Sequence, residues 1–335
     1  DNFLITAEPR INLLKDYPNE LPIKKKSFSV LNDVPLSENE RNSENLFKNT
    51  GIKLKYNRFN LGYGNWNQWW GPGIHSSLML SSNSPDIKTF SFGTFREISF
   101  NKFSIYSKMI LSEFSTDIAS YKTANDPYDI FISGISTYIK FFSDPIITIG
   151  INRLILSNNY PGYLSNTQLK SWGIQDAAKS VFQPIFGQSN RGAIQTVIGS
   201  SGFDPWDQTM SGFINLNFPK DLLEFYVEIA SDDRRANLSD FLAHWDHTIG
   251  YLIGFNKYIP KQNSLFFIRG EYVNTLPSNT TNPKFYRGSP NLDNFYNNSI
   301  YDYSTYRGRR IAAHSGSSSD DLILYVGLKS SKNLF

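Results

Sequence analysis

Alternation of apolar and polar residues is the feature of this sequence that most limits its fold. In residues 221–231, the odd-numbered positions from 223 to 229 are apolar, whereas Glu224 and Glu228 occupy the other face of an extended chain. The same period of two recurs at 208–218, 248–256, 264–273 and 321–329. Strands of roughly ten residues with this period are typical of transmembrane β-barrels, whereas ordinary strands have about five or six residues.

The first half of the sequence shows the same pattern with more interruptions. We expect strands at 51–63, 87–98, 101–114, 128–142 and 145–156, with a bulge near Asn57-Arg58 where the phase of the first one reverses. Pro219-Lys220 leaves room for only a tight hairpin turn, whereas 275–310 forms a long polar connection. Tight turns that alternate with long loops are typical of outer-membrane barrels, whose long loops face the exterior.

Two regions do not look like strands. Residues 166–186 carry a helical apolar stripe that ends before Pro184, and residues 1–50 look irregular or partly helical. No run of about eighteen apolar residues exists, so a membrane-spanning helix is not expected. The sequence predicts an all-β chain, namely a transmembrane antiparallel β-barrel of the outer membrane (51–335) with a small helical or irregular periplasmic part.

Composition supports this class. Aromatic residues make up 15% of the 335 residues and charged residues only 19%, below the quarter or so that is usual in soluble domains. A net charge of +3 does not predict a nucleic-acid surface, and the absence of cysteine excludes disulfides and thiolate chemistry. The first ten residues, DNFLITAEPR, have no signal-peptide features, so in an exported protein we expect the signal peptide to have been removed already.

Residues 65–84, NWNQWWGPGIHSSLMLSSNS, differ from generic barrel sequence. This segment resembles the signature of the capsule-assembly Wzi family, and three later stretches agree in order: FPKDLLEFYVEIASDD, NLSDFLAHWDHTIGYLIGF and YRGRRIAAHSGSSSDDLILYVG. The resemblance covers most of 51–330 and implies a barrel in the outer membrane with a periplasmic helical part. It also implies lectin-like retention of surface polysaccharide and no enzymatic activity. With ten or eleven expected strands, the chain has too few for the family's large barrel, so we expect it to be incomplete at its ends.

Candidate carbohydrate-binding residues fall into two groups. Indole faces stack on sugar rings, and neighbouring polar groups bind hydroxyls, although tryptophans beside Gly-Pro-Gly are also typical of a purely structural turn, which we favour. Charged residues near strand ends can bind glycan carboxylates or form weak surface ion pairs. The candidates are Trp66, Trp69, Trp70 and His75 in the first group, and Asp232, Asp233, Arg307 and Arg309 in the second.

Signals for catalysis or metal binding are weak. His244 and His247 have a His-x-x-His spacing without a third ligand at a recognised spacing. Glu224 with Glu228, and Arg269 with Glu271, are best explained as lumen-facing charges that balance one another, although paired carboxylates also serve glycosidases. Motifs for activated nucleophiles and phosphate binding are absent from the sequence. We therefore expect no catalytic residues, no metal and no cofactor.

The function predicted from the sequence is non-enzymatic binding of capsular or other surface polysaccharide, which the protein helps to anchor or assemble. Expected partners are that polysaccharide, outer-membrane lipid and, as further candidates, other outer-membrane proteins, but no nucleic acid. Three alternatives remain open at this point: an accessory subunit of a larger outer-membrane complex, a passive channel and, last, an envelope glycan hydrolase.

Overall fold

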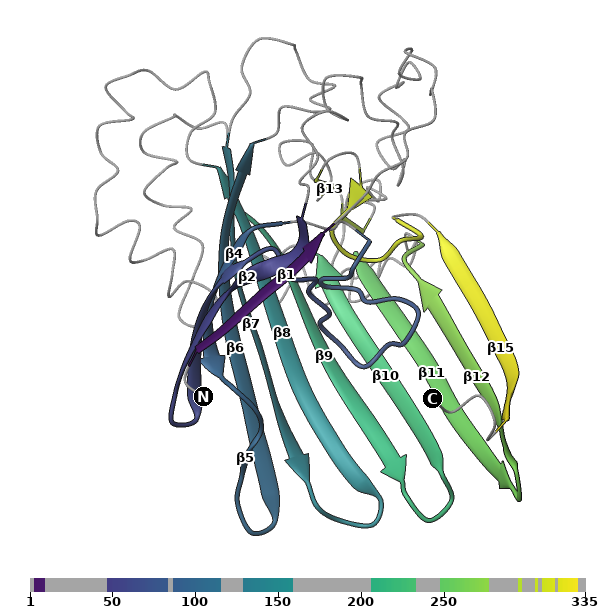
Figure 1. The fold of residues 1–335 in the computed structure, drawn as a ribbon. Helices are drawn as coiled ribbons and strands as arrows, with labels where there is room; N and C mark the ends of the chain where they lie inside the picture. Colours follow the sequence, from purple (N-terminus) through teal and green to yellow (C-terminus); the bar gives the residue numbers. More distant parts are fainter. Residues whose placement is uncertain are drawn as a thin grey trace, which may run out of the picture.

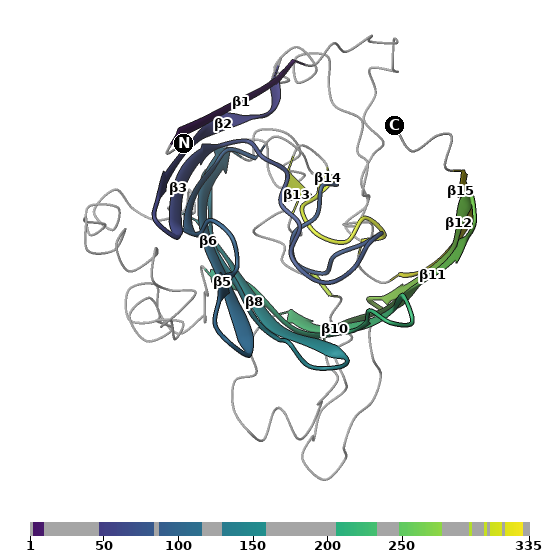
Figure 2. The ribbon, with the colours of Figure 1, turned by 60° about the horizontal axis from the view of Figure 1, so that its bottom comes forward.

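Thirteen strands form one antiparallel sheet that curves around an inner space (Figures 1 and 2). The structure, a computed structural model, describes residues 3–9, 47–83, 87–115, 129–158, 206–232, 248–276, 295–296, 305–306, 309–316 and 319–330. Neighbouring strands follow the order of the chain, and β5 adds a short pairing to β6. The strands are β1 (Phe3–Pro9), β2 (Phe47–Tyr56), β3 (Phe59–Gly64), β4 (Thr89–Thr94), β5 (Ile98–Ser99), β6 (Phe103–Ser115), β7 (Asp129–Phe141), β8 (Ile146–Asn158), β9 (Trp206–Phe218), β10 (Leu223–Asp232), β11 (Ile249–Lys261), β12 (Ser264–Asn274) and β15 (Asp320–Ser330).

The predicted all-β class is confirmed. A separate two-stranded pair consists of β13 (Thr305–Tyr306) and β14 (Arg309–Arg310). Within the described residues, no helix is long and apolar enough to cross a membrane. Within these same residues, the order of hydrogen-bonded strands runs from β1 to β15, and β1 does not pair with β15.

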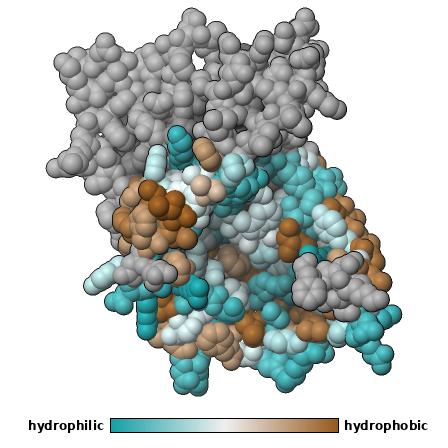
Figure 3. All heavy atoms as spheres, in the orientation of Figure 1, coloured by the Kyte–Doolittle hydropathy of each residue, from teal (hydrophilic) through white to brown (hydrophobic). Residues whose placement is uncertain are grey.

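The two faces of the sheet have opposite polarity, as the alternation predicts. On β10, Phe225, Val227 and Ile229 are 45%, 39% and 53% exposed, whereas Tyr226 and Glu228 on the other face are almost fully buried. In Figure 3 hydrophobic side chains gather at the left over β1 and β2 and at the right along β15. The outer face is therefore apolar and exposed.

Buried polar side chains line the inner face, with at least one on each strand from β4 to β12 apart from the short β5. They include Ser91, Ser112, Ser136, Asn152, Ser211, Glu228, Asn256 and Glu271. Several of them bond to one another: Asn152 Nδ2 donates to Ser211 Oγ at 3.0 Å, and Ser211 Oγ donates to Glu228 Oε1 at 2.7 Å. Hydrogen bonding makes their burial tolerable.

Connections between the strands alternate in length as expected. Short turns at 142–145, 219–222 and 262–263 alternate with much longer connections, such as those after β8 and β12. The short turns lie together at the lower end of the sheet in Figure 1. The ends of β6, β8, β10 and β12 from which the long connections start therefore lie at the opposite end of the sheet.

Two expectations for the N-terminal region need correction. The expected bulge at Asn57-Arg58 is a two-residue turn between β2 and β3, in which Asn57 has a φ of +56°, a conformation that Asn tolerates. The turn pairs Tyr56 with Phe59 and Leu54 with Leu61, so the reversed phases lie on one face. Within the segment expected to be irregular or partly helical, residues 3–9 form β1 and pair with β2.

The rest of that segment, 10–46, and the helix expected at 166–186 lie outside the described residues. The prediction of ten or eleven strands falls short of the thirteen in the main sheet. The additional strands are β1, the β2–β3 division and the very short β5, which a periodicity test over about ten residues does not resolve.

Two loop segments occupy the concave side of the sheet (Figure 2). We call residues 65–83 and 309–316 together the plug. The backbone N–H of Ser81 donates to Ile311 O at 2.9 Å, which joins the two segments. One apolar cluster joins the plug to β6, β7 and β8, and a second joins it to β10, β11 and β12. Their members are Trp70, Met79, Leu80, Ile110, Ile132, Leu154, Leu156 and Ile311, and Leu78, Tyr226, Ala230, Leu252, Val273, Phe295, Tyr296, Ala312 and Ala313.

Candidate functional site

Glu271 of β12 anchors the plug to the sheet. Its carboxylate accepts hydrogen bonds from the backbone N–H groups of Ile74 and Ser76 at 2.7 Å each, and from that of His75 at 3.2 Å. Tyr226 Oη donates to the same carboxylate at 2.8 Å. The Tyr226 ring has room because it lies over Gly254, where a Cβ atom would approach the ring to 2.3 Å. One buried acidic side chain thus fixes three successive residues of the plug.

The Gly71-Pro72-Gly73 turn has a steric explanation. Gly71 has a φ of +126°, which favours glycine, and a Cβ atom there would lie 2.6 Å from Glu228 Oε2. At Gly73, a Cβ atom would lie 2.1 Å from Ser76 O. The turn therefore lets the plug backbone approach both the inner wall and itself, which favours the structural interpretation of this motif.

The three tryptophans of the motif have different environments. Trp70 is 3% exposed within the first apolar cluster, and Trp66 donates from Nε1 to Thr6 Oγ1 at 2.8 Å. The Lys53 ammonium lies 4.3 Å from the centre of the Trp66 ring. Trp69 is 39% exposed, and its Nε1 donates to Gly73 O at 2.7 Å, which fixes the orientation of the indole. Among the three, Trp69 has the exposed face suited to a ligand.

His75 belongs to a cluster that includes residues far away in the sequence. His75 Nε2 lies 3.2 Å from Asp321 Oδ2, and His314 Nε2 lies 3.0 Å from the same oxygen. Tyr325 Oη lies 3.1 Å from His75 Nδ1. The three ionisable side chains are 23% to 35% exposed, so solvent reaches them. We call His75, His314 and Asp321 the His–Asp cluster.

Sequence reasoning selected His75 but missed the roles of Asp321, Tyr325 and Glu271. His75 and Asp321 are 246 positions apart, and His75 and Tyr325 are 250 apart. No local spacing can indicate contacts of that kind. The inward position of Asp321 and Tyr325 on β15, opposite the apolar face, was the available signal.

The charged candidates divide into buried and undescribed residues. Asp232 is 3% exposed and accepts a hydrogen bond from Thr209 Oγ1 at 3.0 Å. Arg309 lies in β14, but its side chain is outside the described part, as are Asp233 and Arg307. Of these four candidates, the structure describes only the side chain of Asp232, so their grouping as a site stays a prediction. The histidine pair at 244 and 247 also lies outside the described residues.

Arg310, the neighbour of Arg309, has a structural setting. It is fully buried, and its guanidinium lies 5.0 Å from the centre of the Tyr296 ring. Tyr296 Oη donates to Leu78 O at 2.8 Å, and burial raises the pKa of this phenol above its ordinary value. Both side chains hold the plug in place.

The inner-face charges do not balance one another as expected. Glu224 accepts hydrogen bonds from the side-chain amides of Asn215 and Asn256, at 2.6 and 2.7 Å. Arg269 donates to Tyr258 Oη at 2.8 Å, and its guanidinium lies 4.9 Å from the centre of the Phe267 ring. Amides, hydroxyls and aromatic rings serve as partners where the sequence predicted opposite charges.

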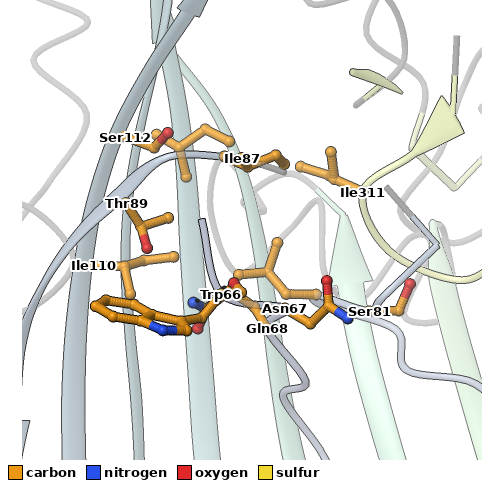
Figure 4. Close-up of a pocket in the computed structure, with 11 residues that line it drawn as sticks. Trp66, Asn67, Gln68, Ser81, Ile87, Thr89, Ile110, Ser112 and Ile311 are labelled. Atoms are coloured by element: carbon orange, nitrogen blue, oxygen red, sulfur yellow. Dashed lines mark hydrogen bonds between the residues drawn. The ribbon is translucent and has the colours of Figure 1, made fainter. Parts of the chain in front are cut away.

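A small cavity lies between the plug and β4, β6 and β7 (Figure 4). Its lining includes Trp66, Gln68, Thr89, Ile110 and Ser112. The volume is about 20 Å³, enough for about one water molecule and far below the several hundred Å³ of usual ligand pockets. This cavity is not a sugar site.

Comparison with known proteins shows the class of fold. No family model matches the chain, and no curated protein matches its sequence. Among solved structures, the chain is similar to Wzi of Escherichia coli, an outer-membrane protein involved in group 1 capsule assembly and a carbohydrate-binding β-barrel. The TM-score is 0.54 at 13% identity, and the match covers 86% of this chain and 54% of Wzi. The chain thus has a Wzi-like β-barrel fold and spans about half the length of Wzi.

Proposed function

We propose that this protein is an outer-membrane β-barrel that binds surface polysaccharide and helps to anchor or assemble it, without cleaving it. The observation that carries the membrane location is the reversed polarity of the sheet. On β15 alone, Leu322, Leu324, Val326 and Leu328 are 60% to 75% exposed. Soluble proteins rarely expose a contiguous apolar surface of more than a few hundred Å². Lipid is the environment that such an apolar face suits, while the polar side chains lie on the inner face of the sheet.

Three observations support carbohydrate as the ligand. The fold is similar to that of a carbohydrate-binding barrel. Trp69 presents an exposed indole on the plug, and the imidazole, carboxylate and hydroxyl groups around His75 offer hydrogen bonds within the same region of the plug and β15. Flat apolar area beside convergent polar groups is suited to sugars. Binding at such a partly exposed site is weak for each sugar unit, and a repeating polymer increases it through avidity.

The packing of the plug does not favour the channel alternative. One apolar cluster joins plug residues to β6, β7 and β8 of the inner wall, and the other joins them to β10, β11 and β12. A described part of the lumen is therefore occupied by protein. If partner proteins instead of lipid covered the apolar outer face, the chain would be an accessory subunit of a larger complex. The experiment below distinguishes this alternative from polysaccharide binding.

The test is binding of the detergent-purified chain to surface polysaccharide extracted from its own bacterium. We expect saturable binding that becomes about tenfold weaker in Trp69→Ala, equivalent to about 1.4 kcal/mol of stacking energy. Phe100→Ala is the matched control, because Phe100 is an exposed aromatic residue in the turn between β5 and β6 and is 47% exposed. A folded wild-type chain that does not bind the polysaccharide but co-purifies with barrel proteins would support the accessory-subunit alternative and contradict this proposal.

A further inference from the structure

We propose that the His–Asp cluster is a binding site for a divalent transition metal, with Zn²⁺ as the preferred ion, and that the bound metal fastens the plug to β15. This inference departs from the absence of metal expected from the sequence, and it does not depend on polysaccharide binding. The three ligands come from the two segments of the plug and from β15.

The distances fit a tetrahedral site. In tetrahedral zinc sites with bonds of about 2.0–2.1 Å, neighbouring ligand atoms are about 3.3 Å apart. Asp321 Oδ2 lies 3.2 Å from His75 Nε2 and 3.0 Å from His314 Nε2. All three candidate ligand atoms lie within 4.8 Å of one another. Small rotations of the two imidazoles therefore bring their nitrogens to a common ion.

The surrounding structure already orients each ligand. Glu271 holds the backbone N–H of His75, and Tyr325 Oη contacts the Nδ1 atom that faces away from the proposed metal. His314 lies in a turn closed by the hydrogen bond from Gly316 N to Ala313 O at 3.1 Å. Thr275 Oγ1 at the end of β12 donates to Gly316 O at 2.8 Å, which attaches that turn to the sheet. Ligating histidines commonly have such a partner for the second ring nitrogen.

The ligand types select the kind of ion. Two imidazoles and one carboxylate suit Zn²⁺ and similar first-row metals, whereas Ca²⁺ and Mg²⁺ prefer oxygen ligands. Three protein ligands leave a fourth position for water or an external oxygen ligand. Partial exposure of all three side chains gives the ion a route of entry from solvent.

Without metal, the Nε2 atoms of both histidines lie within hydrogen-bonding distance of Asp321 Oδ2, which accepts from each imidazole that carries its proton on Nε2. Metal binding at Nε2 requires the other tautomer of each imidazole, because the ligating nitrogen must be unprotonated, so each proton moves from Nε2 to Nδ1 of its own ring. The proton of His75 then resides on Nδ1 and is donated to Tyr325 Oη, which acts as acceptor instead of donor. Since the metal binds the folded arrangement preferentially, it stabilises attachment of the plug in proportion to its concentration relative to Kd.

The test measures Zn²⁺ and Co²⁺ binding to the tag-free, folded chain in detergent micelles. We expect one tightly bound ion per chain after dialysis, and the visible absorption of tetrahedral Co²⁺. Bound Zn²⁺ should also slow proteolysis of the plug. Asp321→Asn should weaken binding by more than about tenfold, and Tyr325→Phe by about tenfold, the usual range for a partner of a ligating histidine.

Asp320→Asn is the matched control, since it makes the same change at the adjacent, exposed position of β15 and should leave Zn²⁺ affinity unchanged. A second control, His244→Ala/His247→Ala, removes the other two histidines of the chain and should retain the ion. Equal losses in Asp320→Asn and Asp321→Asn, or loss of the ion only in the His244/His247 variant, would overturn the proposal. So would a folded wild-type chain that binds no Zn²⁺.

Discussion

The outer and inner faces of the sheet obey different rules. Outer positions repeat one requirement along strands such as β10 and β15, namely an apolar side chain at every second residue, as at Leu322 and Leu324. Inner positions differ from strand to strand, because each meets a particular part of the plug: Ile132 packs in an apolar cluster, whereas Glu271 accepts backbone hydrogen bonds. The outer face has a uniform environment, so its residues form a periodic pattern in the sequence. The inner face packs against the plug, whose surface varies, so its residues form an irregular pattern.

The sharpest test of the inner face compares two adjacent tryptophans. Trp70→Ala should lower the free energy of unfolding by about 3–5 kcal/mol, because it leaves a large cavity among buried side chains. Trp69→Ala removes the same side chain from a site that is 39% exposed and should cost much less. Denaturant unfolding of the chain refolded in lipid vesicles measures both. Equal losses of stability would contradict the difference in burial between Trp70 and Trp69.

A charge on the outer face tests whether that face contacts lipid. Val227 lies in the middle of β10 on the apolar face, and Val227→Arg should cost about 2–4 kcal/mol if the residue lies near the membrane midplane. Tyr56→Arg, at the end of β2, is the control and should cost about 0–1 kcal/mol, as expected near the membrane interface. The measurement is the same vesicle-based unfolding.

If Val227→Arg changes the stability by less than about 0.5 kcal/mol, as is usual for substitutions on a water-exposed surface, the apolar face does not contact hydrocarbon. That result would leave the fold intact but remove the main support for a membrane location.

The same contrast explains what the sequence could predict. Ten predicted segments match β2 to β12 and β15 in position, and the apolar set of each clear strand lies outward, because lipid-type burial depends only on the alternation. The turn at Asn57-Arg58 was misread as a bulge, since both interpretations reverse the phase and only cross-strand pairing separates them.

Local sequence could not predict the site. The tryptophan motif correctly identified the segment that lies against the inner wall, but not which indole is exposed. The partners of His75 come from residues 314 to 325, and strand order and register bring them within hydrogen-bonding distance. Pairing of β12 with β15 places Asp321 beside Val273, two residues from Glu271, so one end of the sheet presents both plug anchors.

Removal of the Glu271 charge tests the polar attachment of the plug. Glu271→Gln keeps the shape but weakens the bonds from Ile74 N, Ser76 N and Tyr226 Oη, with an expected loss of about 1–3 kcal/mol. Glu224→Gln is the control, because Glu224 binds side-chain amides of the wall instead of the plug. Hydrogen exchange at residues 71–76 should become faster only in the Glu271 variant. Unchanged exchange there would mean that the apolar clusters alone hold the plug.

The smallest effect is expected at Glu97, in the loop between β4 and β5. The hydrogen-bond partners of its carboxylate lie on β6 and β7 and not in the plug. Partial burial acts to raise the pKa of Glu97, but hydrogen bonds from Ser104, Lys140 and Tyr138, together with the charge of Lys140, outweigh it and lower the pKa below its ordinary value of 4.5. A carboxylate with a depressed folded-state pKa stabilises the protein above its unfolded-state pKa. That contribution is lost as the pH falls through the folded-state value.

Glu97→Gln removes this contribution, so the stability difference between wild type and variant should shrink as the pH decreases from about 6 to about 3. Unfolding in vesicles at several pH values measures the difference, which should be well below the effects at Trp70, Val227 and Glu271 because the carboxylate is partly exposed and solvent screens its interactions. A constant difference across this range would show that the hydrogen bonds of Glu97 do not depend on its charge. A difference as large as that of Glu271→Gln would contradict this ranking, because it would make a partly exposed loop as important to stability as the buried attachment of the plug.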